Sequence, residues 1–205
     1  MYALYLALQK GLDVNYLMFI NNGSKAHRLN SWLLKLLSET TGIAIVTAGK
    51  DKSDIRSLLV KLGADTLISG VMTTSEHMKW YNDICSPIHV KHYAPLWGKQ
   101  PLIALAEMRH LGFRILVIEV NTSLGPRKSW LGKEIDDNIL KEIKELESGR
   151  GMDSIGELGE YHTLVLDCPI YRKKLEILES KTAWENSKGY VIIQNAILQS
   201  KMQRD

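Results

Sequence analysis

Residues 14–49 read VNYLMFINNGSKAHRLNSWLLKLLSETTGIAIVTAG, and this stretch decides the fold class. It opens with a nearly continuous apolar run at residues 14–20, which is typical of a strand buried on both faces. An apolar stripe at helical spacing follows over residues 29–37, Gly42 ends that helix, and residues 43–46 predict a second short strand. A strand, a helix and a strand joined by short glycine-marked turns favour a parallel α/β sheet.

The alternation continues through the first half of the chain, and the second half changes character. The next helical stripe, residues 55–62, has Asp51 or Ser53 as its N-cap and Gly63 as its C-cap. The remaining predicted elements are helices at 2–10, 75–84, 102–111 and about 135–146, and strands at 66–70, 88–93, 113–120, 163–166, 175–178 and 190–193. We assign the last three strands to a smaller mixed sheet. We therefore expect an α/β domain at residues 1–112 and a smaller α+β domain at residues 113–205.

Composition excludes several classes of protein. The 205 residues are 45% hydrophobic and 24% charged, as in a globular protein rather than a disordered one. A net charge of +3 is too small to argue for nucleic-acid binding. No apolar run approaches the roughly 20 residues of a spanning helix, and residues 1–8 lack the basic segment of a signal peptide. Two cysteines, Cys85 and Cys168, give no disulfide framework and fit a reducing cytosol.

Parallel sheets bind ligands beyond the carboxyl ends of their strands. In this chain those ends fall at residues 21–23, 47–50, 70–74 and 95–99. One of them belongs to the stretch SGVMTTS at residues 69–75, where a strand runs into a helix. Free N–H groups at a helix N-terminus attract anions, and the hydroxyl groups can add contacts. Simple N-capping by Thr74 or Ser75 is the alternative explanation of the same residues.

The stretch GELGEYHT at residues 156–163 is the densest group of polar chemistry in the chain. Its two glycines permit a close approach of backbone to a ligand or a positive φ. Between and after them lie two carboxylates, a phenol, an imidazole and a hydroxyl, just before an apolar strand. A glycine-rich turn with solvated acids is the alternative, and on composition alone it is the more common explanation.

The histidines provide no metal site from side chains alone. His89 and His92 lie three residues apart on a predicted strand, so that they point to opposite faces. His77 and His110 lie on predicted helices without an acidic or cysteine partner at metal-ligand spacing. His27 follows the end of the first strand and is the best placed of these for a functional role.

Three aromatic residues have a structural explanation as well as a functional one. Trp97, Trp130 and Tyr161 are each expected to anchor the core, and the wall of a pocket is the alternative role.

Together these stretches resemble the diphthine–ammonia ligase family of N-type ATP pyrophosphatases. The resemblance runs along nearly the whole chain, and the stretch at 156–163 is its most specific part. The other matching pieces, in order, are residues 2–10, the region of His27, Gly70-Val71-Met72 with Ser75, Cys85, Pro95-Leu96-Trp97-Gly98, Trp130-Leu131-Gly132, Asp167 and Pro169.

The resemblance implies a Rossmann-like (HUP-type) parallel sheet sandwiched by helices. Residues 1–112 would then bind nucleotide and residues 113–205 would bind substrate. The implied reaction is amide formation in the cytoplasm with ATP and Mg²⁺. The carboxylate of diphthine, on translation elongation factor 2, attacks the α-phosphate of ATP, and ammonia then displaces AMP from the acyl-adenylate. Elongation factor 2 and ammonium are the implied partners, without nucleic acid or membrane, and a homodimer stays open.

The resemblance also implies roles for individual residues. The implied catalytic residues are Glu157, Glu160 and His162, of which the two glutamates suit the handling of a cation. The nucleotide side receives Gly70, Met72, Ser75 and His27. The substrate side receives Gly156, Gly159, Tyr161, Thr163 and Trp97.

One part of the family pattern is missing from this sequence. The family has a central strand and a loop of the type Ser-Gly-Gly-Lys-Asp-Ser directly before the helix at residues 2–10, where this sequence has only Met1. Residues 48–53 (AGKDKS) resemble that loop superficially but contain one glycine. Either Met1 is internal to a longer gene, or the chain is a paralogue without ATP chemistry. Two further alternatives stay open: a non-catalytic module that binds nucleotide or elongation factor, and an enzyme for another carboxylate.

Overall fold

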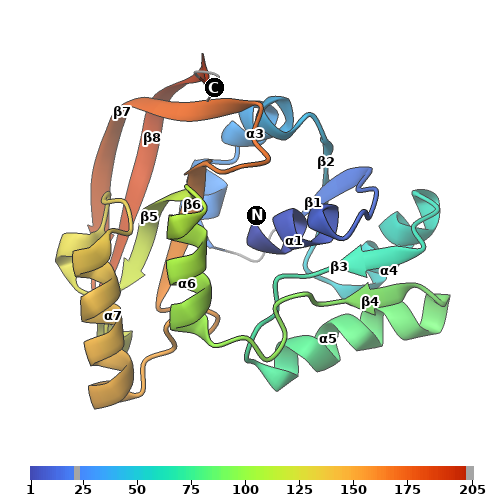
Figure 1. Cartoon of the computed structure of the whole chain (residues 1–205), viewed down its shortest axis with the longest axis horizontal. Coiled ribbons are helices and arrows are strands. Elements are labelled where there is room, and N and C mark those ends of the chain that lie inside the picture. Colours follow the sequence, from blue (N-terminus) through green and yellow to red (C-terminus); the bar gives the residue numbers. More distant parts are fainter. Residues whose placement is uncertain (21–23, 202–205) are drawn as a thin grey trace. The chain divides into compact units, whose positions relative to one another are not determined.

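The computed structural model describes residues 1–20 and 24–201, and its contacts divide the chain into two compact units. Unit 1 comprises Met1–Gly23 and Ile43–Gln100, and unit 2 comprises Ser24–Gly42 and Pro101–Asp205. The ribbon in Figure 1 follows the chain through both. These units differ from the expected domains, because residues 24–42 and 101–112 group with the C-terminal half. The division of the protein into domains at residue 112 stays a prediction.

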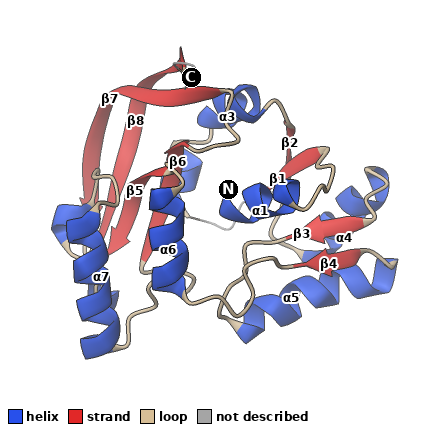
Figure 2. Cartoon of the chain, in the orientation of Figure 1, coloured by secondary structure: helices blue, strands red, loops and turns tan. Residues whose placement is uncertain are grey.

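Unit 1 is built from strands and helices that alternate along the sequence. Its elements are α1 (Tyr2–Gln9), β1 (Tyr16–Ile20), β2 (Ala44–Ala48), α4 (Lys52–Lys61), β3 (Thr66–Ile68), α5 (Ser75–Cys85), the 3₁₀ turn η1 (Ser86–Ile88) and β4 (Lys91–Tyr93). Strands β1 and β2 pair in parallel, as do β3 and β4. Figure 2 shows α4 and α5 beside the β3–β4 pair. Their buried faces meet through Ile55, Leu59 and Ile84, so that apolar helix faces at 3.6-residue spacing close the core.

The parallel pairing confirms a mixed α/β architecture, in the form of two small parallel sheets. Within the described residues, the β1–β2 pair and the β3–β4 pair share no strand pairing. The predicted helix at residues 2–10 is confirmed as α1, so that no strand from the N-terminus lies between β1 and β3. A single Rossmann-like sheet stays a prediction.

Unit 2 has an antiparallel sheet with helices packed on it. Its elements are α2 (Lys25–Leu29), α3 (Leu33–Thr41), α6 (Pro101–His110), β5 (Arg114–Asn121), the 3₁₀ turns η2 (Thr122–Leu124) and η3 (Lys128–Trp130), α7 (Asp137–Arg150), β6 (Tyr161–Asp167), β7 (Lys173–Glu185) and β8 (Lys188–Ser200). The strand order is β6-β5-β8-β7, and neighbouring strands are antiparallel. The expectation of a mixed sheet was therefore wrong: hairpin connection of β7 and β8 forces them to run in opposite directions.

A buried side-chain amide joins the helices of unit 2 to its sheet. Strand β8 pairs with β5 only through residues 188–190. Just beyond, the amide of Asn30 takes the place of a neighbouring strand: its Nδ2 donates to the carbonyl oxygen of Val191 at 2.9 Å, and its Oδ1 accepts from the N–H of Ile193 at 2.8 Å. The same Nδ2 donates to the carbonyl oxygen of Ala26, also at 2.9 Å. The segment 24–42 is thereby fixed to the sheet although about 160 residues separate the partners.

Some local expectations need correction. His89 lies outside the strand, in a left-handed conformation (φ 55°) after η1, so that it does not share β4 with His92. The start of the predicted strand at 88–93 is wrong because Pro87 belongs to that 3₁₀ turn. Trp97 is 46% exposed and is not a core anchor, whereas Trp130 and Tyr161 are buried as expected. Among the described residues, no helix is long and apolar enough to cross a membrane.

We expect Asn30→Ala to lower the free energy of unfolding by at least about 2 kcal/mol, because it removes three hydrogen bonds and leaves buried groups of β8 unpaired. Urea unfolding followed by circular dichroism measures this change. Asn195→Ala, at an exposed position of the same strand, is the matched control. Equal stability of the two variants would show that Asn30 does not hold the segment to the sheet.

Candidate functional site

The loop between α7 and β6 is ordered by two of its own carboxylates. Asp153 accepts from the backbone N–H of Glu157 at 2.6 Å. Glu160 accepts from the N–H of Leu158 at 3.1 Å and from that of Asp153 at 3.4 Å. Glu160 is only 4% exposed, and its carboxylate therefore serves the loop itself. Each acid closes a turn of the loop by binding N–H groups, in the way that side chains cap helices.

Burial sets the electrostatics of this loop. It raises the pKa of Glu160, and the nearby charge of Asp153 raises it further, while the N–H groups of the loop oppose the shift. The pKa of Asp153 is raised in the same way, first by burial. The phenol of Tyr161 donates to the carbonyl oxygen of Ser154 at 2.6 Å, and burial raises its pKa well above the ordinary value. Tyr161 also packs edge-on against Trp130, with ring centroids 6.0 Å apart. The loop thus has a rigid base.

The two glycines of the motif have different surroundings. Gly156 has φ +77°, and a Cβ at this position would lie 2.7 Å from the carbonyl oxygen of Tyr161. Gly159 has φ +91°, but a Cβ there would meet no atom within 4 Å. Gly156 is therefore required by both conformation and packing, and Gly159 by conformation alone. Between them, Glu157 is half-buried and Leu158 is exposed, so that Glu157 is less buried than Glu160.

A second polar cluster lies where α2 meets the sheet of unit 2. Glu119 on β5 is directly opposite His162 on β6. The carboxylate of Glu119 is buried and accepts from the hydroxyl of Ser24 at 2.8 Å and from the N–H of Ala26 at 3.3 Å. The ring of His27 lies edge-on to that of His162, with centroids 5.0 Å apart. The bonds of Glu119 to the start of α2 therefore place His27 beside His162.

Both imidazoles of this cluster are neutral at pH 7. Burial lowers the pKa of His27 to about 4, and the neighbouring His162 adds to the shift, while Glu119 opposes it. The pKa of His162 is also lowered, first by burial; Glu119 raises it and Lys188 lowers it. A neutral imidazole offers one donor and one acceptor and can take up a proton. The cluster is thus a pair of bases beside a buried carboxylate.

The strand end of unit 1 has a different character. After β3, Gly70 is exposed, whereas Met72 is buried. The carbonyl oxygen of Met72 accepts from the N–H of Gly98 at 3.0 Å, and this bond joins two of the predicted strand ends, at 70–74 and 95–99. Helix α5 begins at Ser75, whose exposed hydroxyl donates to the carboxylate of Glu76. Trp97 is exposed beside the Met72–Gly98 contact.

The structure groups the sequence-derived candidates by unit. Unit 2 contains the loop residues, His162, Thr163 in the middle of β6, and His27, which sequence reasoning had placed on the nucleotide side. Unit 1 contains Gly70, Met72, Ser75 and Trp97. The strand end at residues 21–23 lies outside the described residues. The roles of all these residues stay predictions.

Sequence reasoning missed two acids that build the site. Glu119 is the only carboxylate in the strand RILVIEVN, and an acid within such an apolar run was a signal that it is buried and bound. Asp153 precedes Glu160 by seven residues and had no comparable signal, because its hydrogen bonds to the loop depend on the turns of Gly156 and Gly159.

The stretch at residues 48–53 does not fit a triphosphate. The carboxylate of Asp54 lies against Gly49, in the stretch 48–53 that superficially resembles a phosphate loop, and a carboxylate there repels phosphate. Across the described part of the chain, no three acidic, histidine or cysteine side chains are grouped to hold a metal ion. Gly70, with open space before its Cα, suits the uncharged part of a ligand.

We expect the free energy of unfolding to fall on acidification, because the unfolded state binds a proton at His27 more readily than the folded state. The unfolded chain takes up a proton near the ordinary pKa of 6.5, whereas the folded chain takes it up only near about 4. Between these values the unfolded state binds more protons, so that folding loses about 2 kcal/mol between about pH 7 and pH 4.5. Urea titrations at both pH values measure the free energy of unfolding. The His27→Gln variant should lose about 2 kcal/mol less of it on acidification than the wild type does. His110→Gln, exposed on α6, should behave as the wild type, and equal losses in all three proteins would contradict the assignment.

We expect Gly156→Ala to destabilise the protein more than Gly159→Ala. Both substitutions place a side chain at positive φ, which costs about 1 kcal/mol. Only the first also forces a Cβ against the backbone of Tyr161, and we expect a further loss of about 1–3 kcal/mol. Thermal unfolding and the rate of proteolysis at the loop measure the difference. Equal effects of the two changes would mean that the loop shifts freely at Gly156.

Comparison with known proteins identifies the family to which the chain is similar. The model described as diphthamide synthase N-terminal domain matches residues 1–92, and the one described as diphthamide synthase C-terminal domain matches residues 100–198. A Danio rerio protein named diphthine–ammonia ligase is 30% identical over 141 residues, which are 66% of this chain and 54% of that protein. A Homo sapiens protein of the same name is 26% identical over 159 residues, covering 77% and 51%.

A Schizosaccharomyces pombe protein, also named diphthine–ammonia ligase, is 30% identical over 130 residues, 62% of this chain and 20% of its own length. The chain thus spans between a fifth and about half of these curated relatives. The two family models follow one another in the expected order and between them leave only short stretches unmatched. The chain belongs to the diphthamide synthase family.

Proposed function

We propose that this protein takes part in diphthamide biosynthesis as an ATP-dependent carbon–nitrogen ligase. It would convert the carboxylate of diphthine, on translation elongation factor 2, to an amide, with ammonia and an acyl-adenylate intermediate. The observation that carries the proposal is the carboxylate-braced loop at 153–163, which lies inside the region matched to the C-terminal family model. The relatives named diphthine–ammonia ligase support the same chemistry.

Unit 1 would provide the nucleotide side as part of a Rossmann-like, HUP-type sheet. Ligands of such sheets bind beyond the carboxyl ends of the strands. Gly70 and Met72 lie at that end of β3, and Ser75 begins the helix that follows. Mg²⁺, when bound with ATP, would supply charge neutralisation at the phosphates. The carboxylate of Asp54 beside Gly49 argues against residues 48–53 as the phosphate-binding loop.

Within unit 2, the two glutamates of the loop have different proposed roles: Glu160 holds the loop backbone, and Glu157 binds a cation. Glu160 is a positioning residue, because both of its carboxylate oxygens bind N–H groups of the loop. Glu157 is held by its own N–H to Asp153 and has a half-buried side chain. A carboxylate on a backbone fixed in this way suits a cation, either ammonium or the trimethylammonium group of diphthine, since both need a nearby negative charge.

His162 would take the proton that amide formation releases. Its lowered pKa makes it too weak a base to deprotonate ammonium efficiently. After ammonia attacks the acyl carbon, however, the bound nitrogen is cationic and far more acidic, and a neutral imidazole is sufficient to accept its proton. Glu119, directly opposite on β5, would stabilise the imidazolium that forms.

One observation favours a second candidate. The stretch at residues 48–53, with the carboxylate of Asp54 against Gly49, does not suit phosphates, as expected of a non-catalytic paralogue that binds nucleotide or elongation factor without turnover. A ligase acting on another carboxylate uses the same site and differs only in substrate.

The test compares this chain with a version extended by a strand and a Ser-Gly-Gly-Lys-Asp-Ser loop. We expect ATP to bind much more tightly to the extended chain in calorimetric titration, because the loop supplies N–H groups and a lysine for the phosphates. With diphthine-bearing elongation factor 2, ATP and ammonium, we expect AMP and the amide to form, with the amide detected by mass spectrometry of the modified peptide.

In the extended chain, Glu157→Gln should lower the rate of amide formation at least tenfold, about 1.4 kcal/mol, and leave the affinity for ATP unchanged. Glu39→Gln, exposed on α3, is the control. Normal turnover by Glu157→Gln would remove this residue from the mechanism. Tight ATP binding without turnover on any carboxylate would favour the non-catalytic paralogue.

A further inference from the structure

A chain of three hydrogen-bonded side chains in unit 1 has no part in the proposed function. The hydroxyl of Ser69 lies 2.8 Å from Nε2 of His92, and Nδ1 of the same ring lies 2.8 Å from Oδ1 of Asn82. Ser69 directly follows β3, His92 is the middle residue of β4, and Asn82 lies on α5. The ring of Tyr81 stacks on that of His92, with centroids 5.3 Å apart, and limits its rotation.

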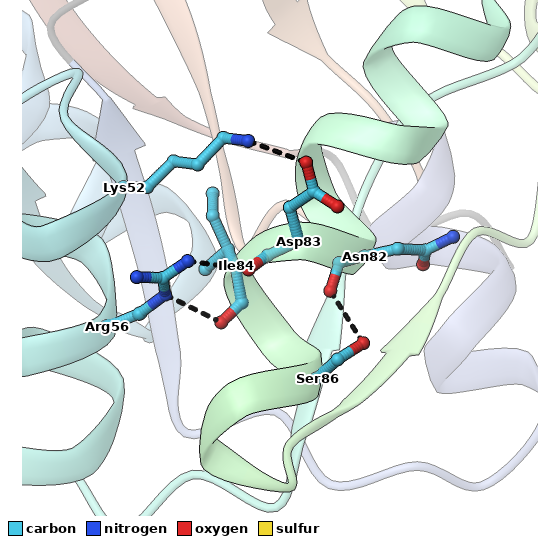
Figure 3. A network of polar contacts seen from close by, with 6 residues as sticks. All are labelled: Lys52, Arg56, Asn82, Asp83, Ile84 and Ser86. Atoms are coloured by element: carbon cyan, nitrogen blue, oxygen red, sulfur yellow. Dashed lines mark hydrogen bonds and ion pairs between the residues drawn. The ribbon is translucent and has the colours of Figure 1, made fainter.

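The hydrogen-bonding groups fix the direction of this chain. An amide oxygen can only accept, so that Nδ1 of His92 carries the proton and Nε2 presents its lone pair to the hydroxyl of Ser69. Burial lowers the pKa of His92, which keeps the ring neutral. Figure 3 shows the Asn82 side chain directed away from the Lys52–Asp83 ion pair, while its backbone oxygen accepts from Ser86. Asn82 is therefore available to orient the imidazole.

Gly70, the residue after Ser69, has a backbone N–H that could stabilise an oxyanion formed at Ser69. Among the described residues, no hydrogen bond to the backbone N–H of Gly70 is formed. A Cβ at Gly70 would meet no atom within 4 Å, and the residue is exposed. In serine hydrolases of the α/β class, the N–H of the residue after the nucleophile stabilises the oxyanion. Gly70 thus combines an N–H without a hydrogen-bond partner among the described residues with open space at its Cα.

We propose that Ser69 is a nucleophile for small acyl groups, with His92 as its general base and Asn82 as the residue that positions His92. Hydroxyl, imidazole and an orienting third group within hydrogen-bonding distance define this arrangement, independently of fold. The inference needs neither bound nucleotide nor unit 2, although it shares Gly70 with the nucleotide side of the proposed ligase.

The reaction is a balanced acyl transfer. His92 Nε2 takes the hydroxyl proton as Oγ of Ser69 bonds to the carbonyl carbon of an ester, and the oxyanion forms next to the N–H of Gly70. The oxyanion collapses, the bond to the alcohol oxygen breaks, and His92 returns the proton to that oxygen. Water then attacks the acyl-serine with the same help from His92, and the carboxylic acid leaves as the Ser69 hydroxyl is restored.

Burial limits the substrate to small groups. Ser69 is 5% exposed, and Val71 and Met72 beside it are buried. Because Ser69 is so little exposed, the smallest acyl group, acetyl, on an activated ester is the appropriate probe.

The experiment uses the full 205-residue chain and 4-nitrophenyl acetate, without ATP. We expect release of 4-nitrophenolate and an acetyl group on Ser69 in the peptide map. Ser69→Ala and His92→Gln should each lower the rate at least tenfold, whereas Ser57→Ala and His77→Gln, at exposed positions on α4 and α5, should leave it unchanged. Circular dichroism confirms that each variant is folded.

Asn82 is tested by a pair of variants. Asn82→Leu removes the acceptor for Nδ1 and should slow acylation, whereas Asn82→Asp keeps an acceptor there and should restore it. Acetylation at other residues only, or equal rates in the Ser69→Ala protein and the wild type, would overturn the proposal. Because the wild-type peptide map identifies the acylated residue directly, the result does not depend on the variants folding.

Discussion

The burial of one carboxylate governs the arrangement of unit 2. Glu119 lies in the middle of an apolar sheet, where an unpaired charge costs several kcal/mol. Its partners are the hydroxyl of Ser24 and the N–H of Ala26, both at the start of α2. A helix of five residues is not stable alone, so this carboxylate and the amide of Asn30 are what keep α2 on the sheet. The position of His27 follows from that docking.

The same principle organises the loop before β6. Glu160 is buried and Asp153 is half-buried, and N–H groups of the loop bind both carboxylates. Such bonds hold the backbone in one conformation, because releasing any of them leaves a buried acceptor unpaired. The backbone of Glu157 is fixed by its bond to Asp153. A loop held in one conformation is a better cation site than a flexible acidic turn, because little ordering is needed on binding.

Sequence reasoning succeeded where the signal is local and failed where it is not. The apolar periodicity at residues 55–62 and 75–84 predicted α4 and α5, and the polar density at 156–163 identified the loop. The pairing of Asn30 with Val191 and Ile193 spans more than 160 residues, and no spacing rule encodes it. Trp97 was misjudged because aromatic residues favour burial on average, whereas this one lies in a turn closed by the Met72–Gly98 bond. Side-chain roles depend on such long-range partners.

Unit 1 is stabilised differently, and this difference bears on its chemistry. Its strands form two separate parallel pairs, and parallel pairing is weaker per residue than antiparallel pairing. The pairs rely on the apolar faces of α4 and α5 and on polar ties at their ends, such as the bonds from Arg56 to the carbonyl oxygens of Asp83 and Ile84. Figure 3 shows these ties joining α4 to the end of α5. The sheet of unit 2, by contrast, has its central strands β5 and β8 paired on both sides. The carboxylate-braced loop joins this sheet at β6, and its own bonds to Asp153 and Glu160 fix it within unit 2.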